Sequence, residues 1–309
     1  MTEHASLPDP AGEDFLLHRP RLLGLAYRML GDMDEAEDVV QDAYLRWHQA
    51  DREAVRSPEA WLVTVVTRLA VDRLRRLATE RAAYPGPWLP EPIATAEAPV
   101  VPSGLPTPDY RAELTSDLSI ALLVLLERLA PEERAAFVLR EVFGTDYAEI
   151  AQILERSTDA IRQMVHRART RVHAERRRVA IPPDEHERML ERFLTALAAD
   201  DAPALVALLA PDVVLATDGG GQARAARQWL AGPDRVSRFL FGVMRKFGHP
   251  GTPRFVWLNG QPALLTVDDG GGVTASTMLD VDEGRIRRIF IVRNPGKLRR
   301  VLEPVAPVE

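Results

Sequence analysis

A proline-rich stretch near the centre of the sequence constrains the architecture most strongly. Residues 84–108 contain eight of the chain's 24 prolines and few apolar residues at regular spacing. Because proline fixes φ and removes a backbone donor, this stretch predicts an extended, semi-rigid linker. A second stop, Ile181-Pro182-Pro183, ends the helical pattern that follows the linker. The 309 residues therefore divide into separate compact units, as a chain of this length predicts.

Two helical units flank the linker, and a unit with both helical and strand patterns follows them. Apolar residues recur at helical spacing from Phe15 to Ala82 and from Leu114 to Val179. Beyond residue 183, three helical patterns precede four alternating runs with Gly, Asp and Asn turns between them, which predicts a curved antiparallel sheet with helices on one side. The helices are expected at 185–199, 202–209 and 233–247, and the strands at 254–258, 263–267, 273–281 and 286–292.

Composition excludes several classes of protein. The chain has no cysteine, so disulfides, thiolate zinc sites and cysteine nucleophiles are ruled out. Its longest apolar run, Ile120 to Leu126, is far shorter than the roughly 20 residues that cross a bilayer. We therefore expect a cytoplasmic protein with no membrane partner, no metal site and no cofactor.

Residues 146–172 predict two helices joined by a short turn. Asp146 could cap the first helix in a capping box with Glu149, and Ser157 or Thr158 could cap the second. The second helix has an apolar face made by Ile161, Met164, Val165, Ala168 and Val172. Its opposite face carries donors that could reach phosphates or base edges in a major groove: Arg162, Gln163, His166, Arg167 and Arg169. The alternative is a helical hairpin whose arginines only face water.

This helix-turn-helix resembles a known family. The stretch YAEIAQILERSTDAIRQMVHRARTRV resembles region four of extracytoplasmic-function sigma factors, and LERLAPEERAAFVLREVFG is similar to its lead-in helices. The resemblance implies that the second helix reads the minus-thirty-five promoter element and that the module contacts the flap of RNA polymerase. The DNA contacts that it implies are Ser157, Thr158, Arg162, Gln163, His166 and Arg167. Which of them read bases rather than phosphates stays open.

An acidic helix near the start of the chain predicts a different partner. GDMDEAEDVVQDAYLRWHQA holds six carboxylates and no basic residue before Arg46, so it repels DNA and favours a basic protein. A merely solvated acidic helix is the alternative. The run from Asp34 to Gln41 resembles the sigma region-two helix that docks on the clamp coiled coil of the largest polymerase subunit. The implied contacts are Asp34, Glu35, Glu37, Asp38 and Gln41, with Asp38 and Gln41 foremost.

The helix that follows suggests a second DNA contact. WLVTVVTRLAVDRLRR looks like the region-two run that recognises the minus-ten element, and with the loop Ala50 to Ser57 it could capture an unstacked base. Its candidate DNA contacts are Arg68, Arg73, Arg75 and Arg76. A core helix with salt-bridged arginines is the other interpretation, because Asp72 lies four residues from both Arg68 and Arg76. Both interpretations can hold together.

Three short signatures resemble one subgroup of the family, whose C-terminal domain of the SnoaL-like, nuclear transport factor 2-like fold replaces a separate anti-sigma protein. Taken singly, each could be an ordinary turn. Gly296 stands where the subgroup has an acidic residue, so a contact made by that side chain is in doubt. The signatures are Trp88-Leu89-Pro90-Glu91-Pro92, Asp218-Gly219-Gly220-Gly221 and Asn294-Pro295-Gly296-Lys297-Leu298.

The resemblance implies two all-α sigma domains followed by an α+β, cone-shaped SnoaL-like domain. We expect sigma region two at 12–82, a linker at 83–112, region four at 113–180 and the SnoaL-like domain at 184–302. The expected function is that of an alternative sigma factor that binds core RNA polymerase and promoter DNA and is tuned by its own C-terminal domain. Two alternatives stay open: isomerase-like catalysis or small-molecule sensing in the C-terminal domain, and a helix-turn-helix regulator independent of polymerase. For catalysis, Asp212 and Asp218 are conceivable bases, but all five tyrosines precede residue 184 and no partner for either base is visible.

Overall fold

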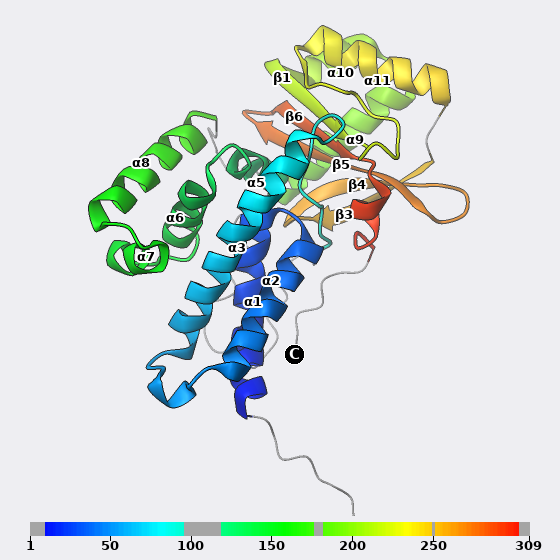
Figure 1. Cartoon of the computed structure of the whole chain (residues 1–309). Helices are drawn as coiled ribbons and strands as arrows, with labels where there is room; N and C mark the ends of the chain where they lie inside the picture. The colour runs from blue at the N-terminus through cyan, green and yellow to red at the C-terminus, as the bar shows by residue number, and fades with distance from the viewer. Residues whose placement is uncertain (1–9, 96–118, 176–181, 249–250, 303–309) are drawn as a thin grey trace, which may run out of the picture. The chain divides into compact units, whose positions relative to one another are not determined.

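The computed structural model, shown in Figure 1, describes residues 10–95, 119–175, 182–248 and 251–302. They form two compact units. The first unit combines the described residues up to Ala78 with Leu129–Arg169, and the second combines the described residues of Thr79–Arg128 with those of Thr170–Ala306, so the last residues of α3 and α8 are counted with the second unit. No helix among the described residues is both long enough and apolar enough to span a membrane.

The first unit is entirely helical. Its elements are α1 (Pro10–Leu30), α2 (Met33–Gln49), η1 (Arg52–Ala54), α3 (Pro58–Ala82), α6 (Pro131–Glu141), α7 (Tyr147–Leu154) and α8 (Thr158–Glu175). Asp32 caps α2 by accepting a hydrogen bond from the Glu35 amide at 3.1 Å. The ring centroids of Trp47 on α2 and Trp61 on α3 lie 5.3 Å apart, so aromatic packing joins these two helices.

The second unit contains a helix from the middle of the chain and the whole C-terminal domain. Its elements are α5 (Ile120–Leu126), α9 (Pro183–Ala198), α10 (Ala202–Leu208), β1 (Leu209–Asp218), β2 (Leu230–Ala231), α11 (Pro233–Phe247), β3 (Thr252–Leu258), β4 (Gln261–Val267), β5 (Val273–Asp282), β6 (Arg285–Val292) and η2 (Pro295–Leu298). The strands form one sheet in the order β2-β1-β6-β5-β4-β3. The predicted α+β class is therefore confirmed.

The sheet is mixed, which corrects the prediction of a purely antiparallel one. β1 and β6 run parallel, with Leu215 opposite Ile289, while the other strand pairs are antiparallel. β1 and the short β2 were also missed. Alternating residues mark the two faces of a strand but not the direction of its partner, and Pro211-Asp212 interrupts the alternation within β1.

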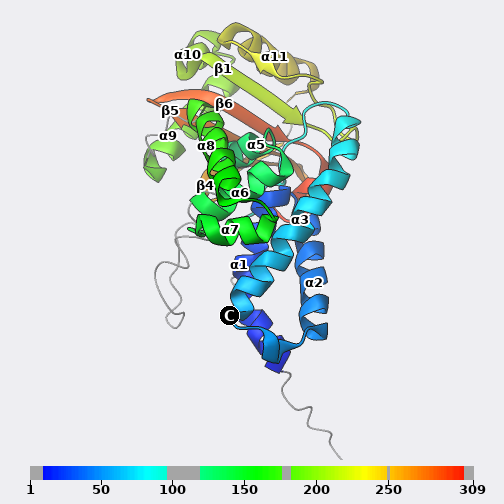
Figure 2. The ribbon, with the colours of Figure 1, turned by 60° about the vertical axis from the view of Figure 1, so that its left-hand side comes forward.

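The two faces of the sheet carry separate cores. On one face, Phe193, Leu240 and Phe241 from the helices pack with Leu215 and Ile289, and Figure 2 shows α10 and α11 lying beside β1. The opposite core is formed by different elements. It contains Leu89, Ile120, Ala121 and Val124 together with strand residues Ala216, Leu265, Met278, Phe290 and Val292. The sequence prediction assigned helices to one side of the sheet and did not foresee that residue 89 and α5 would cover the other.

Residues 84–95 are an extended segment packed on the C-terminal domain. Leu89 is fully buried, and Ala94 forms an isolated antiparallel bridge with Leu258 at the end of β3. The bridge is flanked by a hydrogen bond from Thr95 N to Trp257 O at 3.0 Å and one from Asn259 N to Ile93 O at 2.9 Å. This part of the expected linker is therefore integrated into a domain. Residues 96–112 of the expected linker lie outside the described residues.

Candidate DNA, polymerase and regulatory sites

The helix-turn-helix has the two helices and the tight turn that its sequence predicts. α7 ends at Glu155, whose φ of 54° places it in the left-handed region and turns the chain toward α8. Ser157, rather than Thr158, supplies the cap of α8, because its Oγ accepts a hydrogen bond from the Ala160 amide at 3.2 Å. The predicted capping box of α7 is wrong: the Asp146 side chain makes no cap bond and lies instead 3.6 Å from Arg140 Nη1. The attraction of that guanidinium competes with the helix amide for the carboxylate.

The two faces of α8 differ sharply in exposure. Ile161, Val165, Ala168 and Val172 are buried, and Met164 is partly buried. The candidate DNA contacts of α8 are exposed, except that Thr158 is half-buried; the exposed ones are Arg162, Gln163, His166, Arg167 and Arg169, together with Ser157 at the turn. Such a helix presents its polar face to solvent, where a DNA groove could receive it.

The arginines of α8 are held by different partners. Arg167 pairs with Glu133 at 3.2 Å and Arg169 with Glu141 at 2.7 Å, both on α6, and the second contact raises the pKa of Arg169 above its ordinary value. Arg162 pairs with Asp159, one turn earlier on α8, at 3.0 Å, and its guanidinium carbon lies 5.8 Å from the centroid of the Tyr147 ring. Both side chains of that pair are largely exposed, so the pair contributes under about 1 kcal/mol and can be exchanged for a phosphate. Arg176 to Arg178, which extend the basic sequence, lie outside the described residues.

The acidic helix α2 separates into a buried apolar stripe and an exposed polar face. Ala36, Val39, Val40, Ala43 and Trp47 are buried. Among the predicted polymerase contacts, Asp34, Asp38 and Gln41 are exposed, and Glu35 and Glu37 are partly buried. Sequence reasoning missed Leu45, which continues the spacing of Asp38 and Gln41 along the helix and has a relative exposure of 50%. The signal for it was present in the sequence, as an apolar residue that does not share the spacing of Ala36, Val39, Val40, Ala43 and Trp47.

The predicted DNA contacts of α3 are mostly engaged in ion pairs. Arg73 makes a two-pronged contact with Glu35, with Nη2 and Oε1 2.7 Å apart. Thus one predicted DNA contact and one predicted polymerase contact bind each other. Arg76 is exposed and forms no ion pair with any residue that the structure describes.

Asp72 does not pair with Arg68 or Arg76, which corrects the ion pairs that the sequence spacing suggested. Its carboxylate lies 2.8 Å from Arg75 Nη1, and Arg75 also contacts Glu132. Arg68 instead donates to the carbonyls of Ile153 at 2.9 Å and Gln152 at 3.1 Å. These carbonyls end α7, where unpaired acceptors and the negative end of the helix dipole attract a guanidinium.

The Arg75–Glu132 contact perturbs both groups. Glu132 raises the pKa of Arg75, chiefly through their hydrogen bond. Burial by itself would raise the pKa of Glu132, but the hydrogen bond and the positive charge of Arg75 outweigh it and leave that pKa lowered. Both groups are therefore charged at neutral pH.

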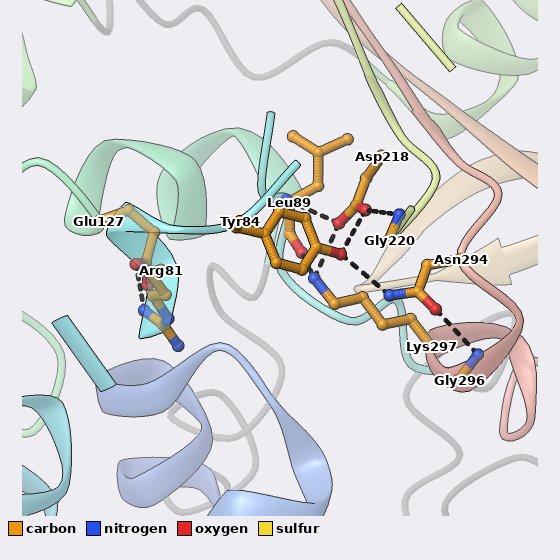
Figure 3. Close-up of polar contacts among 9 residues, drawn as sticks. All are labelled: Arg81, Tyr84, Leu89, Glu127, Asp218, Gly220, Asn294, Gly296 and Lys297. Atoms are coloured by element: carbon orange, nitrogen blue, oxygen red, sulfur yellow. Dashed lines mark hydrogen bonds and ion pairs between the residues drawn. The ribbon is translucent and has the colours of Figure 1, made fainter. Parts of the chain in front are cut away.

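The three short signatures meet in one largely buried cluster, which we call the linker core: Tyr84, Trp88, Leu89, Asp218, Asn294 and Lys297. Figure 3 shows its polar contacts. Asp218 is fully buried and its carboxylate has four donors. One oxygen accepts from Leu89 N at 3.0 Å and Lys297 Nζ at 2.8 Å, and the other accepts from Tyr84 Oη at 2.6 Å and Gly220 N at 3.0 Å. A carboxylate so placed is fully satisfied and ion-paired, as burial requires.

Lys297 connects the last signature to the first. Its Nζ donates to the Leu89 carbonyl as well as to Asp218, and it lies 4.0 Å from the centroid of the Trp88 ring. Arg81, which pairs with Glu127, also contacts this indole, with its guanidinium carbon 3.8 Å from the ring centroid. Two cations thus bind one aromatic ring. Asn294 Nδ2 donates to Tyr84 Oη at 2.9 Å and completes the network.

The glycines of the signatures differ in how much room they leave for a side chain. Gly220 has a φ of 58°, and a Cβ there would lie 2.4 Å from Asn294 Nδ2. At Gly296 a Cβ would meet only Asn294 Oδ1, at 3.3 Å. The turn forms without an acidic side chain at 296, because Asn294 Oδ1 accepts from the Gly296 amide at 3.0 Å.

The structure corrects the expectation that no tyrosine approaches the candidate bases. Tyr84 binds Asp218 directly, and nothing in its local sequence indicated this because the contact spans 134 residues. Asp212 is also engaged, in a contact with Arg287. Sequence reasoning likewise missed Arg81 and Glu127, which lie outside the three signatures.

Comparisons with known proteins agree with this arrangement. Residues 15–80 match the family model Sigma-70 region 2, and residues 119–172 match Sigma-70, region 4. The chain is 37% identical over 295 residues to the ECF RNA polymerase sigma factor SigJ of Mycobacterium tuberculosis, covering 92% of each chain. It is 31% identical over 303 residues to the probable ECF RNA polymerase sigma factor SigI of the same species, covering 96% of this chain and 97% of the relative.

A solved structure extends the similarity over nearly the whole chain. The crystal structure of M. tuberculosis SigJ aligns with a TM-score of 0.73 at 34% sequence identity, covering 93% of this chain and 97% of that one. A match of this extent includes most of the C-terminal domain. Together with the region 2 and region 4 matches, this similarity shows that the chain belongs to the extracytoplasmic-function sigma factors of the sigma-70 family.

Proposed function

We propose that this chain binds core RNA polymerase and directs it to promoters, with its C-terminal domain tuning that activity through the linker core. The observation that carries the proposal is that one chain exposes both an acidic helix face and a basic helix face. α2 exposes Asp34, Asp38 and Gln41, whereas α8 exposes Arg162 and Gln163. An acidic face suits a basic protein surface, and donors on a helix suit a DNA groove.

The roles divide between the two helical modules. In the proposal, the exposed face of α2, with Leu45 as an apolar anchor, docks on the clamp coiled coil of the largest polymerase subunit. The helix α3 and the loop before it act on the minus-ten element, and α8 reads the minus-thirty-five element while its module contacts the flap. The domain limits predicted from the sequence, 12–82 for region two, 83–112 for the linker, 113–180 for region four and 184–302 for the C-terminal domain, are part of this proposal.

Gel filtration and run-off transcription test this first part. The full chain should co-elute with core polymerase, and Asp38→Lys with Leu45→Ala should abolish co-elution while leaving the far-UV circular dichroism unchanged. Asp14→Lys is a matched control, because Asp14 is an exposed acid on α1. Failure of the unmodified chain to bind core polymerase at low salt would contradict the proposal and favour a regulator that acts without polymerase.

The linker core supports the regulatory part. Lys297, Asp218 and Asn294 hold Tyr84 and Leu89, which belong to the segment between the two sigma regions. A segment fixed at one end has less freedom than a free linker, so docking restricts the separation that the two modules can reach. Lys297→Met should release it while keeping much of the apolar stem. The expected result is changed run-off output with unchanged binding of core polymerase, and equal output from both proteins would contradict the regulatory role.

We propose further that the C-terminal domain is not catalytic. Its two conceivable bases are engaged, Asp218 with Lys297 and Tyr84, and Asp212 with Arg287. A base needs access to a substrate proton, and a fully buried carboxylate with four donors has none. Because core polymerase is the proposed partner, we also propose that the protein acts in the cytoplasm.

A further inference from the structure

Three cations gather at one end of the sheet in the C-terminal domain, and we call them the cationic cluster. Arg224 lies in the loop between β1 and β2, Lys246 in the last turn of α11, and Arg293 directly after β6. Arg293 Nη1 donates to the Arg224 carbonyl at 3.0 Å. The guanidinium carbon of Arg224 lies 4.7 Å from the centroid of the Phe247 ring, and Lys246 Nζ lies 5.5 Å from it.

The cluster differs from three other arginines of the same domain, each of which pairs with an acid. Arg245 pairs with Asp200 at 2.8 Å, Arg288 with Asp280 at 3.0 Å, and Arg287 with Asp282 at 3.2 Å. Within the described parts of the chain, none of Arg224, Lys246 and Arg293 contacts a carboxylate. What distinguishes the cluster is that Arg293 and Arg224 lie side by side without a described acid between them, while Arg224 and Lys246 both contact the Phe247 ring.

The surroundings of Arg293 disfavour its positive charge. Burial, first, and the positive charge of Arg224, second, both lower the pKa of Arg293 from its ordinary value. An anion between the two guanidinium groups would oppose the repulsion and replace lost hydration. Arg293 has donors to spare, because a guanidinium carries five N–H groups and, among the residues that the structure describes, its side chain donates one hydrogen bond, to the Arg224 carbonyl.

We propose that the cationic cluster is a binding site for the phosphate group of a small anionic ligand. A phosphate monoester carries close to two negative charges at neutral pH and three acceptor oxygens, which suit the two planar guanidinium forks of Arg224 and Arg293, and Lys246 adds a further positive charge beside Phe247. The site is open to a solute, because Arg224 and Lys246 are exposed and Phe247 has a relative exposure of 47%.

The elements that carry the cationic cluster also contact the linker segment and the linker core. The loop that carries Arg224 lies against the linker segment, since a Cβ at Gly221 would come within 3.0 Å of Pro85 and one at Gly86 within 3.4 Å of the Ala226 carbonyl. On the other side, the Arg293 amide donates to the Asp218 carbonyl at 2.6 Å. A ligand that binds both arginines fixes this loop and so favours the docked linker. This consequence rests on the regulatory role proposed above, whereas binding itself does not.

Calorimetry on the full chain, with inorganic phosphate as the probe and chloride at equal ionic strength as the reference, tests the site. Arg293→Gln and Arg224→Gln should each weaken phosphate binding roughly ten- to hundredfold, as expected for a lost charged hydrogen bond. Arg235→Gln is the matched control, since Arg235 is an exposed arginine of α11 in the same domain and should leave the affinity unchanged. Circular dichroism checks that each variant is folded.

The connection to the linker is measured separately, by hydrogen exchange of residues 84–95 with and without phosphate. Increased protection in the unmodified chain, absent in Arg293→Gln, supports the proposal. No phosphate binding, or an equal loss in Arg235→Gln, overturns the site. A promoter duplex whose affinity falls in Arg293→Gln but not in Arg235→Gln also overturns it, by assigning the cluster to the DNA backbone. None of these measurements involves polymerase, so they fail or succeed independently of the sigma-factor assignment.

Discussion

Ion pairs of the same chemical kind behave differently in the helix-turn-helix and in the linker core. On α8, Arg162 meets Asp159 with both side chains largely in water. In the linker core, Lys297 meets Asp218 with both side chains buried and with further donors and acceptors satisfied. Water screens the first pair, so it is easily exchanged for another anion. The second pair cannot lose one partner without leaving a buried charge, so it fixes a conformation.

The strongest test of this comparison removes one partner of the buried pair. Asp218→Ala leaves the Lys297 ammonium buried without a counter-charge and removes the acceptor of Tyr84 and Leu89. We expect the C-terminal domain to lose about 3–5 kcal/mol of unfolding free energy, measured by urea denaturation. The matched control is Asp212→Ala, which removes a 61% exposed carboxylate and should cost under about 1 kcal/mol. Similar losses in both variants would contradict the distinction between the two environments.

A glycine substitution sharpens the role of Asn294 in the linker core. Gly220→Ala should destabilise the C-terminal domain by about 1–3 kcal/mol, because the backbone is left-handed and the new Cβ would overlap Asn294. Gly284→Ala isolates the backbone contribution, since Gly284 has a φ of 70° and open space around it. Thermal denaturation should show the larger effect at 220. Equal effects would mean that the contact with Asn294 gives way freely.

On the exposed side of the comparison, Arg162→Ala should act on binding and not on folding. We expect the affinity for promoter DNA to fall by about 1–3 kcal/mol, with unfolding free energy changed by under about 1 kcal/mol. If the contact is to a phosphate, the slope of the logarithm of the binding constant against the logarithm of the salt concentration should become shallower by about one. Fluorescence anisotropy at several salt concentrations measures both. Arg171→Ala, on an exposed position of the same helix, is the control for net charge.

The turn of the helix-turn-helix offers a smaller test, in the capping of its helices. Ser157→Ala removes the side-chain bond to the Ala160 amide and should cost about 1 kcal/mol of stability. Asp146→Ala removes a residue at the corresponding position of α7 that makes no such bond, so its cost should be smaller. Urea denaturation of the two variants compares them. A larger loss for Asp146→Ala would reverse the assignment of the caps.

The smallest expected effect is a pH dependence from the partly exposed Arg75–Glu132 pair. The pKa of Glu132 is lowered in the folded chain, so its ionised form favours folding. That stability is present above the ordinary glutamate pKa, about 4.5, and is lost as pH falls through the lowered folded value. Unfolding free energies of the unmodified chain and Glu132→Gln should differ at pH 7 and converge in acid. Divergence in acid would contradict the sign.

Local periodicity explains why much of the molecule could be predicted from the sequence. The helix expected at 233–247 has the bounds of α11, and the alternating run at 286–292 lies within β6. The apolar and polar faces of α8 were also assigned correctly, because residues three and four apart share a helix face whatever surrounds them.

Contacts between distant segments explain what was missed. The parallel pairing of β1 with β6 and the Tyr84–Asp218 hydrogen bond depend on residues 70 or more positions apart. Asp146 shows a related limit at short range. Its spacing to Glu149 fits a capping box, yet Arg140 competes for the carboxylate, and a motif cannot register such competition.

The short bridge between Ala94 and Leu258 also bears on solubility. β3 is one of the two edge strands of the sheet, and residues 93–95 occupy backbone groups at its end. An uncovered outer strand offers unpaired amides and carbonyls to a second molecule, which is a common start of aggregation. Thr252–Phe255 are exposed in any case, so release of this segment would lengthen the uncovered part of this edge by the backbone groups at the end of β3. The released state is therefore best tolerated when it is short-lived or promptly bound by another protein.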